Sequence, residues 1–455
     1  MLDPSMHPEG HLAATQHGDE HDPIMRERTE FVIIGSGPGG ATLARALARA
    51  GRSVVLLERG RDWRRHRLYG TYPGALLYTD RSALLFTREG MNIIRPLMLG
   101  GATSMYCGCA ASPPPWWKER YGIDLDAHAQ RFRAELEIAP LAPERRGTAS
   151  TRIAEAGIAL GMPWEPQDKF VFPDRVDFDC GARCMLGCRC GAKWNAAEFV
   201  DDAAAAGCTV RTSAHVDRID FDSGYATGVS GRIKGRPFSL QADTVISAAG
   251  GIGSARLLRA SGLKEAGRGM AMDTTAMVYG HAPFPGMGND PPMTWSAADD
   301  DIGVLYSTLI DPWLMYPIIM ASKGPGWTLT WPRWGRTAGV MIKLRDEISG
   351  EVGQHEIRKG LTPRDQERLE HAENVGRALL QRVGCPPDTI FTTPLRGTHP
   401  SATVRIGTML TRDLETEVKR LYVCDASVFP ESLGRPTVLT ILALASRLAE
   451  HLLRK

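Results

Sequence analysis

The 455-residue sequence contains no uninterrupted apolar run near the about 20 residues that a membrane-spanning helix needs. It also lacks an excess of charge, with 54 Lys and Arg against 52 Asp and Glu, so it gives no electrostatic reason to bind nucleic acid or an anionic membrane. The first residues are polar and lack the apolar stretch of a secretory signal. We therefore expect a cytoplasmic protein without a membrane span, whose residues 1–27 form a mobile N-terminal arm.

A glycine-rich turn separates a β-branched apolar run from a helical pattern. Residues 30–34 predict a buried parallel strand, and residues 41–51 carry leucines and alanines at helical spacing. Residues 35–40, between them, read Gly-Ser-Gly-Pro-Gly-Gly. This order predicts a dinucleotide-binding unit, because the helix N-terminus offers N–H groups and a positive dipole end to a pyrophosphate.

The residues of this turn have separate expected tasks. Gly35 permits the tight turn, Gly37 lets the backbone approach a pyrophosphate, and Gly40 lets the helix pack closely on the strand. Glu58 ends the next predicted strand, where a carboxylate can accept hydrogen bonds from a ribose diol. The pattern predicts a Rossmann-like α/β domain but does not separate FAD from NAD.

Several further segments resemble the glucose–methanol–choline (GMC) oxidoreductases, and they occur in that family's order. The matching segments are 58–60, 99–106, 215–219, 244–258, 398–407 and 421–430. The resemblance implies an α/β fold in which a Rossmann-like FAD-binding domain carries a smaller α+β substrate domain, an antiparallel sheet backed by helices. The FAD contacts that it implies, together with the glycine turn, are Gly35, Gly37, Pro38, Gly40, Glu58, Arg59, Gly100, Gly101, Thr103, Ser104, Val216, Ala249, Gly250, Asp425 and Ala426.

The resemblance also implies hydride transfer from a carbinol carbon to flavin N5. His399 matches the family's base, and an imidazole with an ordinary pKa near about 6.5 suits removal of a hydroxyl proton at neutral pH. Residues 100–109 contain no histidine, so we expect FAD to be bound non-covalently. Many relatives place a second catalytic His or Asn before the final helix, where this sequence offers Arg435 or Pro436, with Thr437 as a weaker substitute. Neither arginine nor proline can accept a proton there.

The nine cysteines are unevenly distributed along the chain. Four of them have the spacing C-x3-C-x3-C-x-C, namely Cys180, Cys184, Cys188 and Cys190. Thiolates this dense suit an iron–sulfur cluster, and the run is similar to that of the sugar- and gluconate-dehydrogenase branch of the family. The resemblance implies that such a cluster would pass electrons from flavin to an acceptor protein or a quinone. A four-thiolate zinc site and structural or disulfide-bonded cysteines stay open as alternatives.

The sequence changes character between residues 265 and 395, where tryptophans and prolines gather. Alternation over 327–331 and 339–343 predicts antiparallel strands, and residues 363–383 predict an amphipathic helix with Thr362 as its N-cap. The expected division is an FAD-binding domain over 28–264 plus 396–455, which includes the cysteine segment 179–194, and a substrate-binding domain over 265–395.

Taken together, these patterns predict an FAD-dependent dehydrogenase that oxidises a CH–OH group of a small alcohol-type substrate. Two other functions stay compatible with the sequence. One is a non-redox flavoprotein of the lyase type on the same fold, because the second catalytic residue is missing. The other is a cysteine-based electron-transfer protein, which the His399 motif and the tryptophan-rich second domain argue against.

Overall fold

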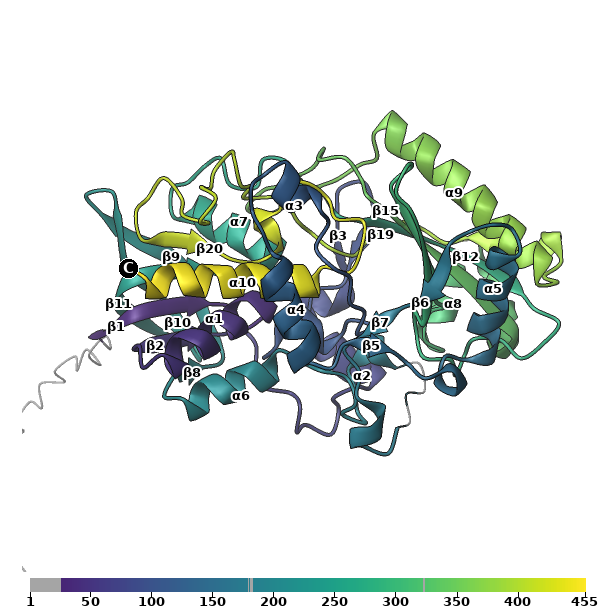
Figure 1. Cartoon of the computed structure of the whole chain (residues 1–455), viewed down its shortest axis with the longest axis horizontal. Coiled ribbons are helices and arrows are strands. Elements are labelled where there is room, and N and C mark those ends of the chain that lie inside the picture. The colour runs from purple at the N-terminus through teal and green to yellow at the C-terminus, as the bar shows by residue number, and fades with distance from the viewer. Residues whose placement is uncertain (1–25, 179, 181–182, 322–323) are drawn as a thin grey trace, which may run out of the picture.

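The computed structural model describes residues 26–178, 180, 183–321 and 324–455. Most of the expected N-terminal arm lies outside these residues, and its last two residues, Arg26 and Glu27, already belong to the first strand. The chain is arranged around two sheets, with the C-terminal helix beside one and a long helix covering the other (Figure 1). In the described part of the chain, no helix combines the length and apolar character needed to cross a bilayer.

The first sheet contains the expected Rossmann-like unit. Its strands are β1 (Arg26–Ile34), β2 (Val54–Leu57), β8 (Thr209–Arg211), β9 (Ala214–Asp222), β10 (Tyr225–Ile233), β11 (Arg236–Ser247) and β20 (Leu421–Val423). The strand order is β8-β2-β1-β11-β10-β9, and β20 pairs with the end of β11. β1 lies parallel to both β2 and β11. All four residues of β2 are buried, as expected for a β-branched run in a sheet covered on both faces.

Helices cover both faces of the first sheet. They are α1 (Pro38–Arg49), α4 (Asp126–Glu135), α6 (Ala197–Ala205), α7 (Gly250–Ala260) and α10 (Val438–Leu453). α1 packs between α6 and α10, while α7 contacts β9. α1 and α7 each follow a parallel strand directly, so their N-termini lie at the carboxyl edge of the sheet, where an α/β fold binds its ligand.

The second sheet is antiparallel in its central strands, as predicted. Its strands are β3 (Leu85–Phe86), β4 (Asn92–Ile93), β6 (Trp164–Pro166), β12 (Thr274–His281), β13 (Trp295–Asp299), β14 (Val304–Thr308), β15 (Thr337–Leu344), β18 (Phe391–Thr392) and β19 (Arg396–Gly397). The order is β3-β4-β19-β12-β15-β14-β13-β6, with β18 beside β12. Strands β3, β4 and β6 come from segments before residue 265, so this sheet uses more of the chain than the expected range 265–395.

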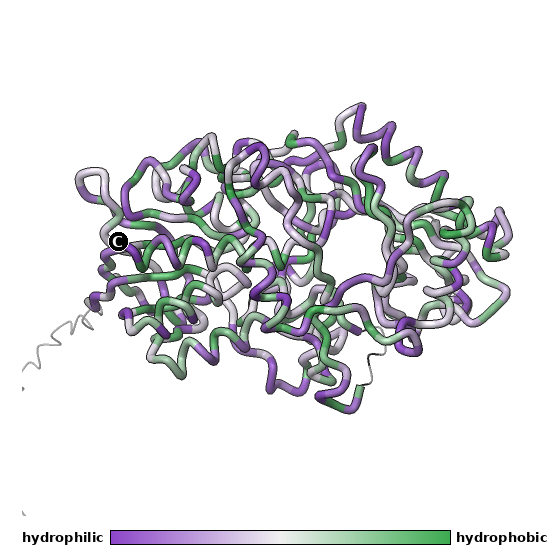
Figure 2. The backbone as a smooth tube through the Cα atoms, viewed as in Figure 1, coloured by the Kyte–Doolittle hydropathy of each residue, from purple (hydrophilic) through white to green (hydrophobic). Residues whose placement is uncertain are grey.

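Helix α9 (Pro363–Arg382) covers the outer side of the second sheet together with α5 (Thr148–Ile158). Its predicted N-cap is confirmed, because the Thr362 side chain accepts a hydrogen bond from the Asp365 N–H at 3.1 Å. Figure 2 shows this helix as largely hydrophilic, in keeping with one exposed face, whereas the strands below it are mostly hydrophobic or neutral.

The expected strand over 327–331 is wrong. These residues lie in the 3-10 helix η6 (Pro325–Arg336), beside the short helix α8 (Met315–Ala321). Pro325 begins η6 and Pro332 lies inside it. Because proline has no N–H to donate to a strand ladder, this stretch favours short turns over a sheet. The other predicted strand, over 339–343, is confirmed within β15.

The remaining short elements connect the two sheets. They are α2 (Tyr72–Leu77), η1 (Asp80–Ala83), η2 (Gly101–Ser104), α3 (Trp116–Glu119), β5 (Ala139–Pro140), η3 (Pro143–Arg145), β7 (Asp168–Lys169), η4 (Pro173–Arg175), η5 (Cys184–Leu186), β16 (Glu351–Val352), β17 (Ile357–Arg358), η7 (Pro387–Thr389) and η8 (Ala426–Val428).

Candidate active site

A cavity of about 710 Å³ lies between the two sheets, within the range of volumes that hold cofactors and substrates. Both sheets contribute to its wall. The predicted FAD contacts found in the wall are Gly35, Gly37, Pro38, Glu58, Arg59, Gly101, Thr103, Val216, Ala249, Gly250, Asp425 and Ala426. Three other predicted contacts, Gly40, Gly100 and Ser104, lie outside this wall and support it through packing and hydrogen bonds.

The glycine turn has the backbone that the pattern requires. Gly35 has a φ of +105°, a conformation that L side chains rarely adopt. A Cβ on Gly40 would lie 1.9 Å from the Gly35 carbonyl oxygen, so this glycine allows α1 to pack against the end of β1. A Cβ on Gly37 would meet nothing within 4 Å, because Gly37 faces the open cavity. The turn therefore presents the N-terminus of α1 to the cavity, which suits a pyrophosphate.

Two buried carboxylates organise this half of the wall. Glu58 accepts hydrogen bonds from the Ser36 N–H at 3.0 Å and the Gly60 N–H at 2.7 Å, so it fixes the turn as well as lining the cavity. Asp425 accepts hydrogen bonds from the N–H groups of Gly250 at 2.8 Å and Ser427 at 2.7 Å. Asp425 thereby caps α7 and η8 while one side of it faces the cavity.

His399 lies in the cavity wall and is held by a buried carboxylate. The Nδ1 atom of His399 is 2.7 Å from Oδ2 of Asp273, and the other carboxylate oxygen, Oδ1, accepts a hydrogen bond from the Gly434 N–H at 2.9 Å. Burial would raise the pKa of Asp273, but the hydrogen bond and charge of His399 hold it below its ordinary value. An ionised Asp273 can only accept, so Nδ1 carries the proton and Nε2 keeps its lone pair for a substrate hydroxyl.

Asp273 is a positioning residue that the sequence analysis missed. It lies 126 residues before His399 in the chain, and no local pattern connects the two. Its backbone conformation is unusual, because Asp273 has a φ of +47°, in a region that Asp and Asn tolerate better than most residues.

Lys343, on β15, is a second residue that the sequence did not reveal. Its side chain is buried in the cavity wall, and Nζ donates a hydrogen bond to Oγ1 of Thr398 at 2.7 Å. Burial lowers the pKa of Lys343, while the charge of Asp273 opposes this. Burial and then the charge of Lys343 lower the pKa of His399. His399 is therefore neutral, and able to accept a proton, at lower pH than an ordinary histidine.

Arg435, Pro436 and Thr437 lie where many relatives carry the second catalytic group, and the structure places them differently. Arg435 forms an ion pair with Asp300 at 2.8 Å and does not line the cavity, whereas Pro436 and Thr437 do. Proline offers no side-chain donor or acceptor. The described wall contains several cationic side chains. Lys343 is the one whose positive charge lowers the pKa of His399.

The roof of the cavity is mainly apolar. Strands β12 and β15 pair in the register Thr275 opposite Lys343 and Met277 opposite Met341, and these four residues all line the cavity. Because side chains alternate along a strand, the inner face repeats every second residue. Further apolar lining comes from Met293, Leu309, Leu314, Met315 and Ile318.

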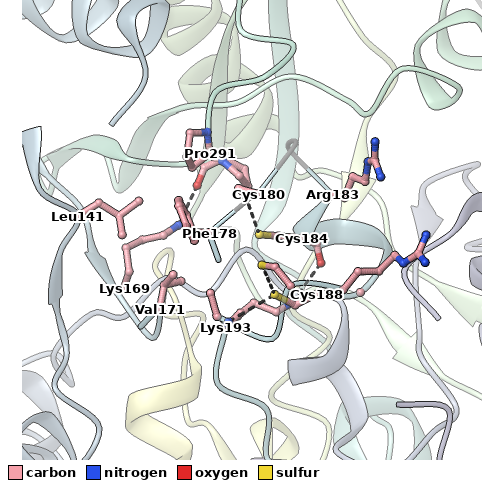
Figure 3. Close-up of a pocket in the computed structure, with 15 residues that line it drawn as sticks. Leu141, Lys169, Val171, Phe178, Cys180, Arg183, Cys184, Cys188, Lys193 and Pro291 are labelled. Carbon is pink, nitrogen blue, oxygen red and sulfur yellow. Dashed lines mark hydrogen bonds between the residues drawn. The ribbon is translucent and has the colours of Figure 1, made fainter. Parts of the chain in front are cut away.

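The four clustered cysteines line a separate cavity of about 300 Å³ (Figure 3). Their sulfur atoms form two pairs, Cys180 with Cys184 at 3.6 Å and Cys188 with Cys190 at 3.5 Å. The 3-10 turn η5 separates this cavity from the larger one, since Cys184 lines the former while Met185 and Leu186 line the latter.

Lys193 connects the cysteine segment to the wall of the larger cavity. Its Nζ donates hydrogen bonds to the carbonyl oxygens of Tyr106 at 2.6 Å and Cys184 at 3.1 Å. A hydrogen bond from Cys180 lowers the pKa of Cys184 to about 6, and the Lys193 charge acts in the same direction. Burial raises the pKa of Cys188 to about 11.

The predicted iron–sulfur ligand set is not supported by the structure. Among the described residues there is no group of three or more His, Cys, Asp or Glu side chains arranged to hold a metal ion. An iron–sulfur cluster needs ligands that converge on it. Here the thiols form pairs in a cavity that also contains two buried lysines, Lys169 and Lys193.

Comparisons with known proteins agree with this architecture. The chain is 27% identical over 493 residues to an uncharacterised GMC-type oxidoreductase of Mycobacterium tuberculosis, which covers 94% of this chain and 76% of that protein. It is 26% identical over 509 residues to a long-chain-alcohol oxidase of Arabidopsis thaliana, covering 94% of this chain and 67% of that protein.

Solved structures show the same fold. A pyridoxine 4-oxidase from Mesorbium loti superposes with a TM-score of 0.70 at 17% identity, covering 94% of this chain and 99% of that chain. A formate oxidase of Aspergillus oryzae, studied for FAD modification, superposes with a TM-score of 0.66 at 15% identity, covering 93% of this chain and 98% of that chain.

Family models cover most of the chain. A Rossmann-like NAD(P)-binding domain model matches residues 33–65, which contain the glycine turn. The GMC oxidoreductase N-terminal model matches residues 75–280, and the C-terminal model matches residues 346–445. The glycine turn, the cavity and the His399 segment all fall within or beside these matches. This chain belongs to the GMC oxidoreductase family and is an FAD-dependent oxidoreductase.

Proposed function

We propose that this enzyme oxidises the CH–OH group of a lipophilic alcohol. The observation that carries the proposal is the His399–Asp273 pair in the wall of a cavity that also contains the glycine turn. FAD, when bound, supplies the acceptor for the hydride that leaves the carbinol carbon. His399 accepts the hydroxyl proton at Nε2, and Asp273 stabilises the imidazolium that forms.

Lys343 supplies the second electrostatic element. As the hydroxyl proton leaves, negative charge develops on the substrate oxygen, and a buried ammonium group beside His399 stabilises that charge. Lys343 thereby takes over the stabilising part of the role that a second His or Asn plays in many relatives. It does not need to accept a proton, because His399 already does so.

The apolar roof supports a lipophilic substrate over a sugar. Met277, Met341 and Met293 line the substrate side, and flexible methionine side chains adapt to varied apolar shapes. The long-chain-alcohol oxidases among the relatives are consistent with this substrate class. FAD is expected to be held non-covalently, since residues 100–109, most of which line the cavity, contain no histidine.

The test is anaerobic reduction of the protein-bound flavin by a panel of alcohols. Primary alcohols of increasing chain length are expected to bleach the flavin absorbance, with an apparent affinity that rises with each methylene group. Gluconate and glucose serve as polar controls and are expected to bleach it poorly. Turnover of an alcohol without any bleaching would contradict the proposal and favour a non-redox reaction.

We propose that the electrons then pass to an external acceptor without an iron–sulfur cluster. The sulfurs of Cys180 and Cys184 lie close together, as do those of Cys188 and Cys190, and the described residues contain no group of three or more metal-ligating side chains, so no electron step is assigned to a metal centre. Iron in anaerobically purified protein is expected to be far below stoichiometric. Mild oxidation is expected to remove about four thiols per chain, because sulfurs 3.5 to 3.6 Å apart need little movement to bond.

Thiol titration of denatured protein before and after oxidation measures how many thiols are lost per chain. Cys184→Ser is expected to prevent loss of one pair, while Cys208→Ser, a change at a buried cysteine outside the cluster, leaves the loss unchanged. Brown protein with stoichiometric iron and broad absorbance beneath the flavin bands would restore the cluster and contradict this prediction.

A further inference from the structure

The opening of the larger cavity is surrounded by exposed apolar side chains. In the described part of the chain, nine of the thirteen exposed large hydrophobic residues lie in two stretches, 72–97 and 311–336, which both contribute to the wall of this cavity. They are Leu76, Leu77, Leu84, Phe86, Ile94, Trp313, Leu314, Ile318 and Leu329, here named the apolar rim. Leu329 is 81% exposed and Leu84 is 66% exposed, far above the exposure of an ordinary core side chain.

The apolar rim is continuous with the cavity. Leu76, Ile94, Leu314 and Ile318 belong both to the rim and to the cavity wall, so they line the entrance itself. A hydrogen bond from the Leu314 N–H to the Tyr72 hydroxyl, at 3.1 Å, joins α2 to the segment before α8. Both halves of the molecule therefore contribute exposed apolar side chains to the entrance.

The rim is also locally basic, although the whole chain is nearly neutral. Its two stretches, 72–97 and 311–336, contain four exposed arginines in their described part, namely Arg81, Arg88, Arg333 and Arg336. Of the acidic residues in the same stretches, Asp80 pairs with Arg95 and Asp311 pairs with Arg396. The one exposed carboxylate, Glu89, accepts a hydrogen bond from the Lys359 N–H at 2.7 Å.

This combination selects the chemistry of the partner. Scattered exposed leucines are ordinary, but exposed apolar side chains that gather on the segments at a cavity entrance indicate a binding surface. Apolar side chains flanked by arginines fit the boundary of an anionic bilayer, where the apolar groups enter the acyl region and the guanidinium groups meet phosphates. A contact made by such side chains lies at the bilayer interface.

We propose that the apolar rim seats this protein on an anionic lipid surface, with the cavity entrance against the bilayer. A lipophilic alcohol then passes from the lipid directly to His399 without crossing water. The substrate-entry half of this inference rests on the proposed function, whereas the membrane half does not.

Vesicle co-sedimentation of the FAD-loaded full chain tests the membrane half. The protein is mixed with vesicles of phosphatidylcholine alone or of phosphatidylcholine with phosphatidylglycerol. Wild-type protein is expected to bind the anionic vesicles at least about tenfold more strongly than the neutral ones, through the arginines and the rim together. Failure to bind anionic vesicles would overturn the proposal.

Paired substitutions separate the rim from other exposed apolar residues. The double variant Leu77→Ser with Leu329→Ser, which changes no cavity-lining side chain, is expected to weaken binding about tenfold. The matched control, Tyr225→Ser with Leu453→Ser, changes two exposed apolar residues outside the rim and is expected to bind as wild type. Equal binding by both variants would overturn the proposal, and so would a wild-type dimer that only the rim variant dissociates.

Flavin reduction separates the two halves of the inference. The rim variant is expected to be reduced normally by a short, water-soluble alcohol and more slowly by a long-chain alcohol supplied in vesicles. Equal rates with the vesicle-supplied alcohol would overturn substrate entry from lipid. If no alcohol bleaches the flavin, the proposed function fails, while co-sedimentation still decides the membrane contact.

Discussion

Replacing His399 with alanine is expected to slow anaerobic reduction of the flavin by an alcohol about 10²- to 10⁴-fold, the usual contribution of a positioned general base. His399 lies in the cavity wall with Nδ1 2.7 Å from Asp273, so the substitution removes the group that accepts the hydroxyl proton. Stopped-flow absorbance of the flavin measures the rate directly.

Retention of FAD is part of this prediction. The glycine turn and Asp425 lie in other parts of the wall and are unaffected by the change, so the variant should remain yellow with an unchanged FAD content. His281→Ala serves as the control, because His281 is a partly buried histidine at the end of β12 in the second sheet and lies outside the cavity wall. A His399→Ala variant reduced at the wild-type rate would remove His399 from the mechanism.

Replacing Lys343 with methionine is expected to slow flavin reduction about 10²-fold, since one preorganised charge near the developing alkoxide is lost. The same change is expected to move the acid limb of the pH profile to higher pH. His399 is active when neutral, and the positive charge of Lys343 lowers the pKa of His399. Without that charge the imidazole binds its proton more tightly, so activity is lost at a higher pH as the pH falls.

Asp273→Asn gives the opposite shift and so controls for general disruption. The carboxylate of Asp273 raises the pKa of His399 against the effects of burial and Lys343, so its loss moves the acid limb to lower pH. If the asparagine oxygen accepts the hydrogen bond from the Gly434 N–H, its NH2 group faces Nδ1 and favours the tautomer that is protonated at Nε2, so this variant is also expected to reduce flavin much more slowly than wild type. Two variants that shift the limb in the same direction, or neither of which shifts it, would contradict the assigned electrostatics. The profile of kcat/KM against pH is the measurement.

The apolar rim links the active site to the surroundings of the protein. An alcohol that partitions into lipid is scarce in water, so an enzyme whose entrance faces the bilayer would meet this substrate where it is concentrated. The exposed leucines of α2 and the residues beside α8 would be a liability for solubility if they had no partner. Binding to a membrane would explain both the exposed leucines and their position at the cavity entrance.

Local patterns in the sequence predicted the nucleotide-binding half accurately. The strand, glycine turn and helix near residues 30–49 form as expected, because Gly35 adopts a φ that favours glycine and Gly40 packs against the Gly35 carbonyl, both within a few residues of sequence. The N-cap of α9 was also predicted, since Thr362 and Asp365 interact across one helical turn. The strand expected over 327–331 was wrong because alternation of tryptophan and threonine says nothing of the flanking prolines.

The sequence alone determined the family and the cofactor and predicted His399 as the base, because these depend on motifs of neighbouring residues. The tertiary structure decided what surrounds His399. It brought Asp273, just before β12, and Lys343, on β15, to the imidazole, directed Arg435 to Asp300 instead of the cavity, and separated the four clustered sulfurs into two pairs. Contacts of this kind depend on the register and crossing of strands, and the pKa of a buried group depends on charges that only folding brings within reach.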